Sequence, residues 1–294
     1  MIEYIFCSTA LEANIKELQV TIPRLLHWYS PVKHYVIVPN ISADIFDNFF
    51  SAYPHVQIIP EEDILSVRLF MTLSKNILGT RVDYNLFRHK WYYQQMLKIL
   101  FSITYELNDS YLVIWDADTI PLGRLDFVKR GKVMLYGTPY EYCVEYYKQI
   151  RNLTGHDYKP RYSYVTQFSC LSARTQKALR AIFLDHTISE RADYQVAEKI
   201  LSSVCEVSVS LGNSDFSEYE LIGYINQNLY TGSQKKLFFL RWGLERRLTN
   251  LQCSILSFIG YIHVTYEQPT FFDEELGWLA FGKLVYSNLQ KALR

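Results

Sequence analysis

The chain has 294 residues, 49% of them hydrophobic, and its 30 Lys and Arg balance 30 Asp and Glu. A formal net charge of zero offers no field to steer the protein onto nucleic acid, so we expect no nucleic-acid partner. The apolar share excludes an intrinsically disordered chain, and the length suits one large α/β domain or two closely packed halves.

The five cysteines are dispersed, odd in number and without the spacing of a metal site. They are Cys7, Cys143, Cys170, Cys205 and Cys253. This pattern indicates reduced thiols that serve as small apolar residues in a cytoplasmic protein. The N-terminus has no basic start followed by an apolar segment, so we expect no signal peptide. The most apolar late stretch, 255–264, is about half as long as a membrane span.

The first 60 residues alternate short apolar strands with helical segments. Pro23 predicts a kink or break in the first helix, and Ser42 is a candidate cap for the second. A β-α-β-α-β order predicts a mainly parallel sheet with helices on its faces. The predicted strands cover 2–6, 34–38 and 56–59, and the predicted helices cover 11–28 and 42–52.

Residues 60–88 form a long connection, in which 74–81 is predicted as a loop or helix edge. Apolar residues then recur at three- and four-residue spacing, which predicts a helix over 90–107. A second face of that helix carries Lys90, Gln94 and Lys98, four residues apart.

Later segments are predicted from shorter patterns. Residues 111–115 are nearly all apolar, as expected for a strand in the middle of a buried parallel sheet. Further strands are predicted at 133–136 and 204–209, and helices at 174–184 and 191–201.

Asp116 and Asp118 follow the strand 111–115 directly. In open α/β sheets, ligands bind just outside the carboxyl ends of the strands. Burying two bare carboxylates there is very costly, and a hard divalent cation offsets that cost. Mg²⁺ uses one or two carboxylates together with substrate phosphates, and Mn²⁺ accepts the same ligands. The pair therefore predicts a Mn²⁺ or Mg²⁺ site; two ordinary aspartates in an exposed turn are the alternative.

Three motifs in order carry a family resemblance. They are W-x-x-Q-Q-x-L-K at 91–98, D-x-D at 116–118 and F-S-E-Y-E at 216–220. Together they resemble GT-A-fold, nucleotide-sugar-dependent glycosyltransferases, and in particular a group of bacterial glycosyltransferase-like proteins largely of unassigned substrate. The resemblance covers about residues 85–225.

This resemblance implies a Rossmann-like GT-A fold with a mainly parallel central sheet flanked by helices and a more variable acceptor-side half. We expect a single domain over 1–294, with a nucleotide-sugar-binding half over about 1–125 and an acceptor-binding half over about 126–294. The implied donor is a nucleotide-diphosphate-sugar. The implied acceptor is a glycan or lipid-linked glycan, in bacterial surface polysaccharide or lipopolysaccharide synthesis.

The resemblance also implies roles for the two aspartates. Asp118 would bind Mn²⁺ or Mg²⁺, which bridges the donor diphosphate, and Asp116 would contact the ribose or sugar and help hold the metal. Lys90, Gln94 and Lys98 are candidate donor-binding residues, because lysines attract phosphate and glutamine can read a base or sugar hydroxyl. A solvated polar face is the alternative for these three. Gln95 could read such a group in the same way, or it could be a surface glutamine.

An inverting transfer needs a general base for the acceptor hydroxyl. Glu218 is the first candidate, followed by Glu220 and Asp215. In an extended segment Glu218 and Glu220 would point the same way. The alternative is a helix cap, because Ser217 and Glu220 fit the S-x-x-E pattern.

Two later features remain open. Some metal-dependent relatives supply a late histidine to the cation, which makes His263 a candidate metal ligand; a histidine satisfied within the core is the alternative. Residues 235–247 are basic and apolar, which suits peripheral contact with the inner membrane face, a clamp on the donor through Arg241, or a partly buried helix.

Other classes of protein fit less well. Haloacid-dehalogenase-type phosphatases, with Asp116 as nucleophile, require Thr or Val where this chain has Ile120. Sugar-phosphate nucleotidyltransferases need a glycine-rich loop after the first strand, and residues 7–14 contain no glycine. A non-catalytic sugar-binding protein is the third alternative.

Overall fold

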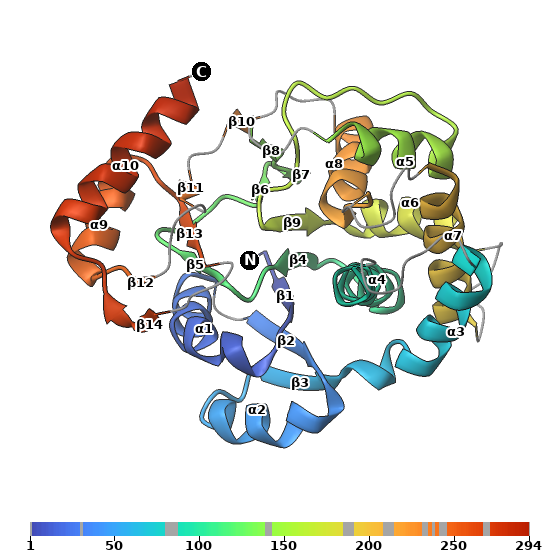
Figure 1. Cartoon of the computed structure of the whole chain (residues 1–294), viewed down its shortest axis with the longest axis horizontal. Helices are drawn as coiled ribbons and strands as arrows, with labels where there is room; N and C mark the ends of the chain where they lie inside the picture. The colour runs from blue at the N-terminus through green and yellow to red at the C-terminus, as the bar shows by residue number, and fades with distance from the viewer. Residues whose placement is uncertain are drawn as a thin grey trace.

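A computed structural model describes residues 2–29, 32–79, 88–138, 143–184, 191–207, 215–230, 235–236, 239–240, 246–266 and 271–293. Its centre is a five-stranded sheet in the order β3-β2-β1-β4-β9 (Figure 1). The first four of these strands are parallel to their neighbours, and β9 is antiparallel to β4. The expected mainly parallel α/β fold is confirmed. The strands are β1 (Tyr4–Thr9), β2 (Val32–Val38), β3 (Val56–Pro60), β4 (Tyr111–Trp115) and β9 (Phe168–Leu171).

The strand order reverses between β1 and β4. From β1 the chain moves outward through β2 and β3, and it then returns to the other side of β1 to form β4. Cys7 is paired with Ile114, so Thr9 at the end of β1 is level with Asp116 after β4. Such a reversal opens a crevice at the carboxyl ends of the two strands, where open α/β sheets bind ligands.

Helices cover both faces of this sheet. On one face, α1 and α2 pack through Ile22 and Phe46 against Val36 of β2. On the other face, α4 packs through Met96 and other residues against Ile5 of β1, and α3 and α5 to α8 group beyond it (Figure 1). The helices are α1 (Ile15–Tyr29), α2 (Ala43–Phe50), α3 (Val67–Leu78), α4 (His89–Thr104), α5 (Val144–Thr154), α6 (Ala173–Phe183), α7 (Ala192–Val207), α8 (Glu218–Leu229), α9 (Asn250–Phe258) and α10 (Trp278–Leu293).

A second, three-stranded sheet has the order β11-β13-β5, and β13 is antiparallel to β5. Through this sheet, residues 263–265 pair with residues 119–121, which directly follow Asp118. Its strands are β5 (Thr119–Pro121), β11 (Phe239–Leu240) and β13 (His263–Thr265). The other short elements are β6 (Val128–Lys129), β7 (Lys132–Val133), β8 (Tyr136–Gly137), β10 (Lys235–Lys236), β12 (Arg246–Arg247), β14 (Phe271–Glu275) and the 3₁₀ turns η1 (Glu12–Asn14), η2 (Asn40–Ser42) and η3 (Glu61–Asp63).

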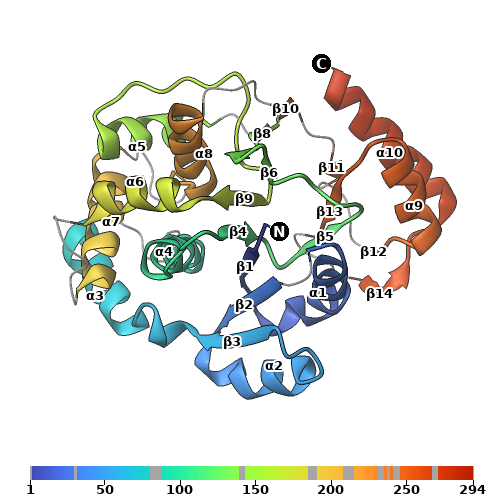
Figure 2. The same ribbon diagram turned by 180° about the vertical axis from the view of Figure 1, so that it is seen from behind.

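The C-terminal helices α9 and α10 lie side by side at one end of the molecule, in front and rear views alike (Figure 2). They share a cluster of buried apolar residues that includes Leu256 of α9 and Phe281 of α10. None of the helices that the structure describes is long and apolar enough to cross a membrane.

Some of the predicted elements are wrong. Pro23 does not break α1, because Ile22 and Leu25 on either side of it are buried and this packing stabilises the helix across the missing N–H. For 74–81 the helix-edge alternative holds as far as residue 78, because residues 74–78 are the end of α3. The predicted strand at 204–209 is instead the last turn of α7 as far as Val207, and residues 208–209 lie outside the described chain.

Glu17 in α1 is fully buried, and neither of its carboxylate oxygens has a hydrogen-bond partner among the described residues. Burial raises the pKa of Glu17 from 4.5 to about 7, although its own backbone N–H and Lys16 act in the opposite direction. The folded protein therefore keeps a proton that the unfolded chain loses at lower pH. The contribution of Glu17 to stability is largest below pH 4.5 and falls as the pH rises to about 7, by roughly 3 kcal/mol in all.

Glu17→Gln is expected to stabilise the protein by about 3 kcal/mol at pH 8 and to change little at pH 5, because glutamine resembles the protonated acid. Urea denaturation at both pH values measures the difference. Glu3→Gln, at an exposed position, is the control and should have no effect at either pH. Equal effects of Glu17→Gln at both pH values would show that Glu17 does not titrate in this range.

Candidate active site

The two aspartates of the D-x-D motif lie at the carboxyl edge of the sheet, where the strand order reverses. Asp116 directly follows β4, and its backbone N–H donates to the carbonyl oxygen of Gln167 at 2.9 Å. The backbone carbonyl of Asp118 accepts from the N–H of Tyr266, just after β13, at 2.9 Å. Both side chains are partly exposed, so the loop presents them to solvent while its backbone is fixed from two sides.

A buried lysine holds the side chain of Asp116. Lys98 of α4 donates through Nζ to Asp116 Oδ1 at 2.6 Å and to Glu218 Oε1 at 2.8 Å. The hydroxyl of Tyr219 also donates to Asp116 Oδ1, at 2.5 Å. Within the described residues both bonds to Asp116 end on Oδ1 and none reaches Oδ2. The start of α8 and one turn of α4 therefore fix one oxygen of Asp116 and leave the other for a ligand.

The charges in this cluster follow from burial and pairing. Burial alone would lower the pKa of Lys98, but Asp116 and Glu218 outweigh it and raise the pKa above its ordinary value. Burial raises the pKa of Glu218, while Lys98 opposes the shift. Burial and then Asp116 hold the pKa of Tyr219 well above its usual range, so its hydroxyl keeps its proton and remains a donor.

Asp118 is supported by a chain of hydroxyl groups. Thr119 Oγ1 donates to Asp118 Oδ1 at 3.2 Å and lies 2.9 Å from Thr265 Oγ1. Thr265 Oγ1 lies 3.4 Å from Nδ1 of His263. Two threonines therefore link the carboxylate of Asp118 to a fully buried histidine.

His263 lies behind this chain, with its ring 6.3 Å from that of Trp115 and 6.0 Å from that of Phe168. The part of the chain that the structure describes contains no group of three or more His, Cys, Asp or Glu residues placed to hold a metal ion. The residues present fit a cation held by the carboxylates of Asp116 and Asp118 and completed by substrate phosphates, as Mg²⁺ usually is. A metal-ligand role for His263 stays a prediction.

The three candidate bases are all buried, and each has different neighbours. Glu218, the first residue of α8, lies beside Lys98. Glu220 accepts from the hydroxyl of Ser163 and from the N–H of Tyr164, the latter at 2.9 Å. The N–H of Asp215 donates to the hydroxyl of Tyr92 at 3.1 Å. Only Glu218 is brought into the lysine cluster.

The expected parallel orientation of Glu218 and Glu220 is wrong, because the segment is helical from Glu218 onward rather than extended. The helix cap is confirmed: Ser217 Oγ accepts from the N–H of Glu220 at 3.3 Å. The carboxylate of Glu220 turns toward Ser163.

The donor-binding candidates on α4 separate in the structure. Lys98 is buried, so the alternative that it belongs to a solvated polar face is wrong for this residue. Lys90 is exposed and Gln94 is half-buried, and no bond within the described chain ties either to the carboxylates. Gln95, the second glutamine of the W-x-x-Q-Q-x-L-K motif, contacts the cluster: with its amide nitrogen toward the carboxylate, it donates to Glu218 Oε1 at 3.1 Å.

Gln167 is a residue of the site that the sequence did not reveal. It is buried and adopts a left-handed backbone with φ of 61°, a conformation that costs a non-glycine residue about 1–3 kcal/mol. Its carbonyl accepts the N–H of Asp116. Such strain is concentrated at functional sites, and here it lies directly beneath the first carboxylate.

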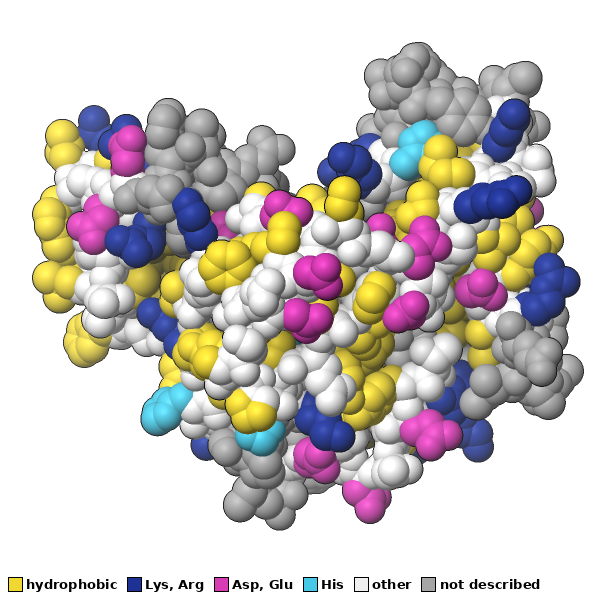
Figure 3. Space-filling view, turned by 90° about the horizontal axis from the view of Figure 1, so that it is seen from below, with side chains coloured by type: hydrophobic (Ala, Val, Ile, Leu, Met, Phe, Trp, Pro, Cys, Tyr) yellow, Lys and Arg dark blue, Asp and Glu magenta, His cyan; other side chains and the backbone are white. Residues whose placement is uncertain are grey.

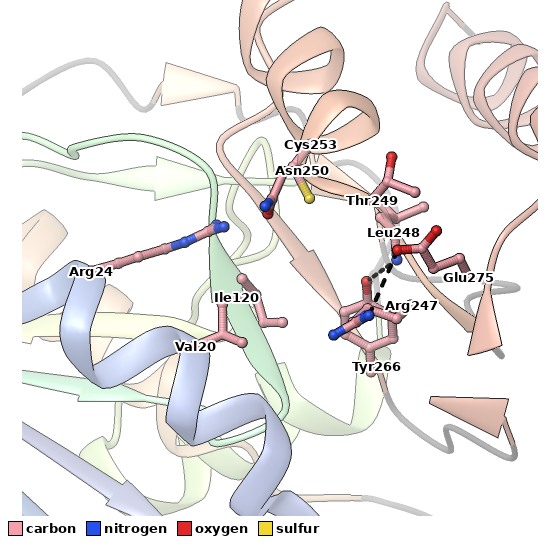
Figure 4. A pocket seen from close by; sticks show the side chains of 10 residues that line it. All are labelled: Val20, Arg24, Ile120, Arg247, Leu248, Thr249, Asn250, Cys253, Tyr266 and Glu275. Carbon is pink, nitrogen blue, oxygen red and sulfur yellow. Dashed lines mark hydrogen bonds and ion pairs between the residues drawn. The ribbon is translucent and has the colours of Figure 1, made fainter. Parts of the chain in front are cut away.

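Two cavities among the described residues lie beside α1 and α9. One of about 130 Å³ is lined by Arg24 and Val20 of α1 and by Tyr266, whose hydroxyl accepts the N–H of Leu248 (Figure 4). A more open one of about 530 Å³ adjoins it at Arg24. Residues 235–247, for which a membrane or donor contact is predicted, fall largely outside the described chain, as does Arg241.

Comparisons with known proteins give one family and several similar folds. A model described as a family of unknown function, DUF6492, matches residues 8–239. Mouse xyloside xylosyltransferase 1 in its apo form aligns with 90% of this chain and 98% of its own, at 10% identity and a TM-score of 0.42.

Two structures of LgtC also align. An active-site mutant of LgtC aligns with 97% of this chain and 96% of its own, at 14% identity and a TM-score of 0.45. The galactosyltransferase LgtC in complex with donor and acceptor sugar analogs gives the same coverage, at 11% identity and a TM-score of 0.43. A search among curated proteins finds no match.

Proposed function

The chain belongs to the DUF6492 family of unknown function, and we propose that it is a metal-dependent glycosyltransferase that uses a nucleotide-diphosphate-sugar. The observation that carries the proposal is the D-x-D pair at the reversal of strand order. One oxygen of Asp116 is fixed there by Lys98 and Tyr219, and Asp118 follows two residues later. The placement agrees with the three motifs by which the sequence resembles GT-A-fold glycosyltransferases.

The charge balance supports a cation at this place. Within the described residues, Asp116, Asp118 and Glu218 bring three carboxylates near one ammonium group, that of Lys98. If all are ionised, the cluster carries a net charge of minus two, which a divalent ion would neutralise. Mn²⁺ or Mg²⁺ there would stabilise the negative charge that develops on the departing nucleoside diphosphate.

The residues of the chain itself orient the site. Lys98 and Tyr219 hold Asp116 in one rotamer, and Thr119 does the same for Asp118. Because these bonds come from the chain's own side chains, we infer that the site needs little rearrangement to receive the diphosphate. The crevice between β1 and β4 is the proposed place of the nucleotide.

Nucleotide-dependent melting tests the proposal. We expect UDP or GDP to raise the melting temperature only when Mn²⁺ or Mg²⁺ is present, and a screen of nucleotide-sugars to reveal metal-dependent hydrolysis of one of them. Hydrolysis of an aryl phosphate without nucleotide binding would indicate the phosphatase instead. If both responses are absent, a non-catalytic sugar-binding protein is indicated.

Glu218 is the proposed general base, since burial raises the pKa of its carboxyl and a higher pKa favours proton acceptance near neutral pH. Glu218→Gln is expected to lower transfer by about 10²-fold or more while metal-dependent donor binding stays near normal. Glu220→Gln is the comparison, because Glu220 bonds Ser163 rather than Lys98 and should affect stability more than rate. A parallel loss of donor binding in Glu218→Gln would make Glu218 a positioning residue for Asp116.

The acceptor and the cellular setting complete the proposal. We propose a glycan or lipid-linked glycan as acceptor, in bacterial surface polysaccharide or lipopolysaccharide synthesis, on the sequence resemblance. A cytoplasmic location agrees with the five dispersed cysteines, which are all free in the structure.

A further inference from the structure

Exposed apolar side chains concentrate on the two C-terminal helices. The described residues include 16 large hydrophobic side chains that are exposed, and eight of them belong to α9, to the residue after it, or to α10. The eight are Leu251, Ile255, Phe258, Ile259, Trp278, Leu279, Tyr286 and Leu289. With Lys283 they form what we call the α9–α10 surface. A concentration of this kind marks an interaction site.

On α9, the exposed residues form one stripe. Leu251, Ile255 and Phe258 follow each other at spacings of four and three, so they share a face of the helix. They are 61%, 37% and 90% exposed. The opposite face is apolar as well, because Leu256 is fully buried in the cluster with α10. The solvent-facing side of α9 is therefore apolar, as is the side that packs against α10.

The same holds for α10. Phe281 and Leu284 pack toward α9, whereas Trp278, Leu279 and Tyr286 are 54%, 76% and 64% exposed. Seen from below, hydrophobic side chains line the outer edge of the lobe that contains the two helices, at the left of Figure 3. Each helix thus buries one apolar side within the protein and presents another to solvent.

The charge on these helices has one sign. α9 carries no charged residue, and α10 carries Lys283 and Lys291 but no carboxylate. Lys283 is exposed and lies between Leu279 and Tyr286 on the same face, at spacings of four and three. Among the described side chains just before α10, the carboxylates of Glu274 and Glu275 are paired with Arg246 and Arg247 at 3.2 and 3.7 Å.

We propose that the α9–α10 surface docks on the headgroup region of an anionic lipid bilayer. Leucine and phenylalanine side chains suit the acyl boundary, tryptophan and tyrosine favour the interface, and an exposed lysine without nearby free carboxylates attracts anionic lipid. A second copy of the chain is a poorer occupant, because it would bring another positively charged face against Lys283. The proposal uses none of the residues of the candidate active site, so it is independent of the proposed reaction.

Co-sedimentation of the full chain with lipid vesicles tests the proposal. We expect binding to vesicles of phosphatidylcholine and phosphatidylglycerol, and much weaker binding to phosphatidylcholine alone. Leu279→Glu and Phe258→Glu should each lower partitioning by about tenfold or more, since each places a carboxylate in the apolar surface. Lys283→Glu should reduce the preference for the anionic vesicles.

Ile41→Glu is the matched control. Ile41 is 87% exposed but lies in η2, between β2 and α2, and its replacement should leave partitioning unchanged. Melting temperatures confirm that the variants fold; Phe258, at 90% exposure, is the position where a carboxylate disturbs the fold least. Failure to bind the anionic vesicles, or equal losses in Ile41→Glu and Leu279→Glu, would overturn the proposal. So would a dimer in light scattering that Leu279→Glu dissociates without any effect of lipid.

Discussion

Asp118→Asn is expected to abolish sugar transfer and metal-dependent nucleotide binding while leaving the fold intact. The substitution keeps the shape of the side chain and removes its charge, so the metal would lose one of its two protein ligands. Asp118 is only half-buried, and an amide oxygen can still accept from Thr119 Oγ1. A loss of about 10³-fold or more in transfer is expected, the size of several kcal/mol in transition-state stabilisation.

Transfer rates with Mn²⁺ present and the nucleotide-induced shift in melting temperature measure this loss. Asp126→Asn is the matched control, because Asp126 follows on the same segment and its side chain is exposed. It should leave both quantities unchanged. Near-normal transfer by Asp118→Asn would refute the central role given to the D-x-D pair.

Lys98→Met is expected to destabilise the protein by about 3–5 kcal/mol, because it leaves the buried carboxylate of Glu218 without its counter-ion beside Asp116. The loss should be larger at pH 8 than at pH 5, since protonation of Glu218, whose pKa burial already raises, relieves the uncompensated charge. Transfer should fall as well, because Asp116 loses the bond that orients it. Urea denaturation and transfer rates measure the two effects.

The double variant Lys98→Met with Glu218→Gln distinguishes loss of the ion pair with Glu218 from loss of the packing of the Lys98 side chain. Removing the buried carboxylate together with the lysine should recover part of the lost stability, because no unpaired charge remains between α4 and α8. Lys90→Met, on the exposed face of the same helix, should change stability by less than about 0.5 kcal/mol. If the double variant is less stable than Lys98→Met alone, the pair is not the source of the effect.

Local pattern was sufficient for the central strands and for the D-x-D pair. The apolar run 111–115 matches β4 at both ends, because a strand buried on both faces has no polar residue to blur its limits. The helix before it was also predicted, although it begins one residue earlier and ends three residues sooner than expected. The position of the two carboxylates at the carboxyl edge of the sheet could be predicted, because they directly follow this strand.

Pattern failed where distant contacts decide the outcome. Val204 and Val207 read as part of a strand, yet Ile200, Leu201 and Val204 are buried at helical spacing and keep α7 helical. The pairing of Lys98 with Glu218 joins residues 120 positions apart, which no local rule predicts.

Two contacts of the site could not be predicted from the sequence. The left-handed backbone of Gln167 has none, because glutamine is not a residue that favours that conformation. Gln95 was seen as part of a motif, but its contact with Glu218 depends on how α8 approaches α4.

The contact between β5 and β13 has a consequence for the timing of assembly. Thr265, whose hydroxyl bonds Thr119, is 146 residues further along the chain, and the N–H that fixes the backbone of Asp118 comes from Tyr266. During translation the two aspartates are synthesised well before β13, the strand that supports the loop after them. A nascent chain that already contains β1 to β4 therefore lacks the strand that holds the loop after β4. The carboxylates reach their final arrangement only once residue 266 has left the exit tunnel, so a stalled or truncated product does not present a finished site.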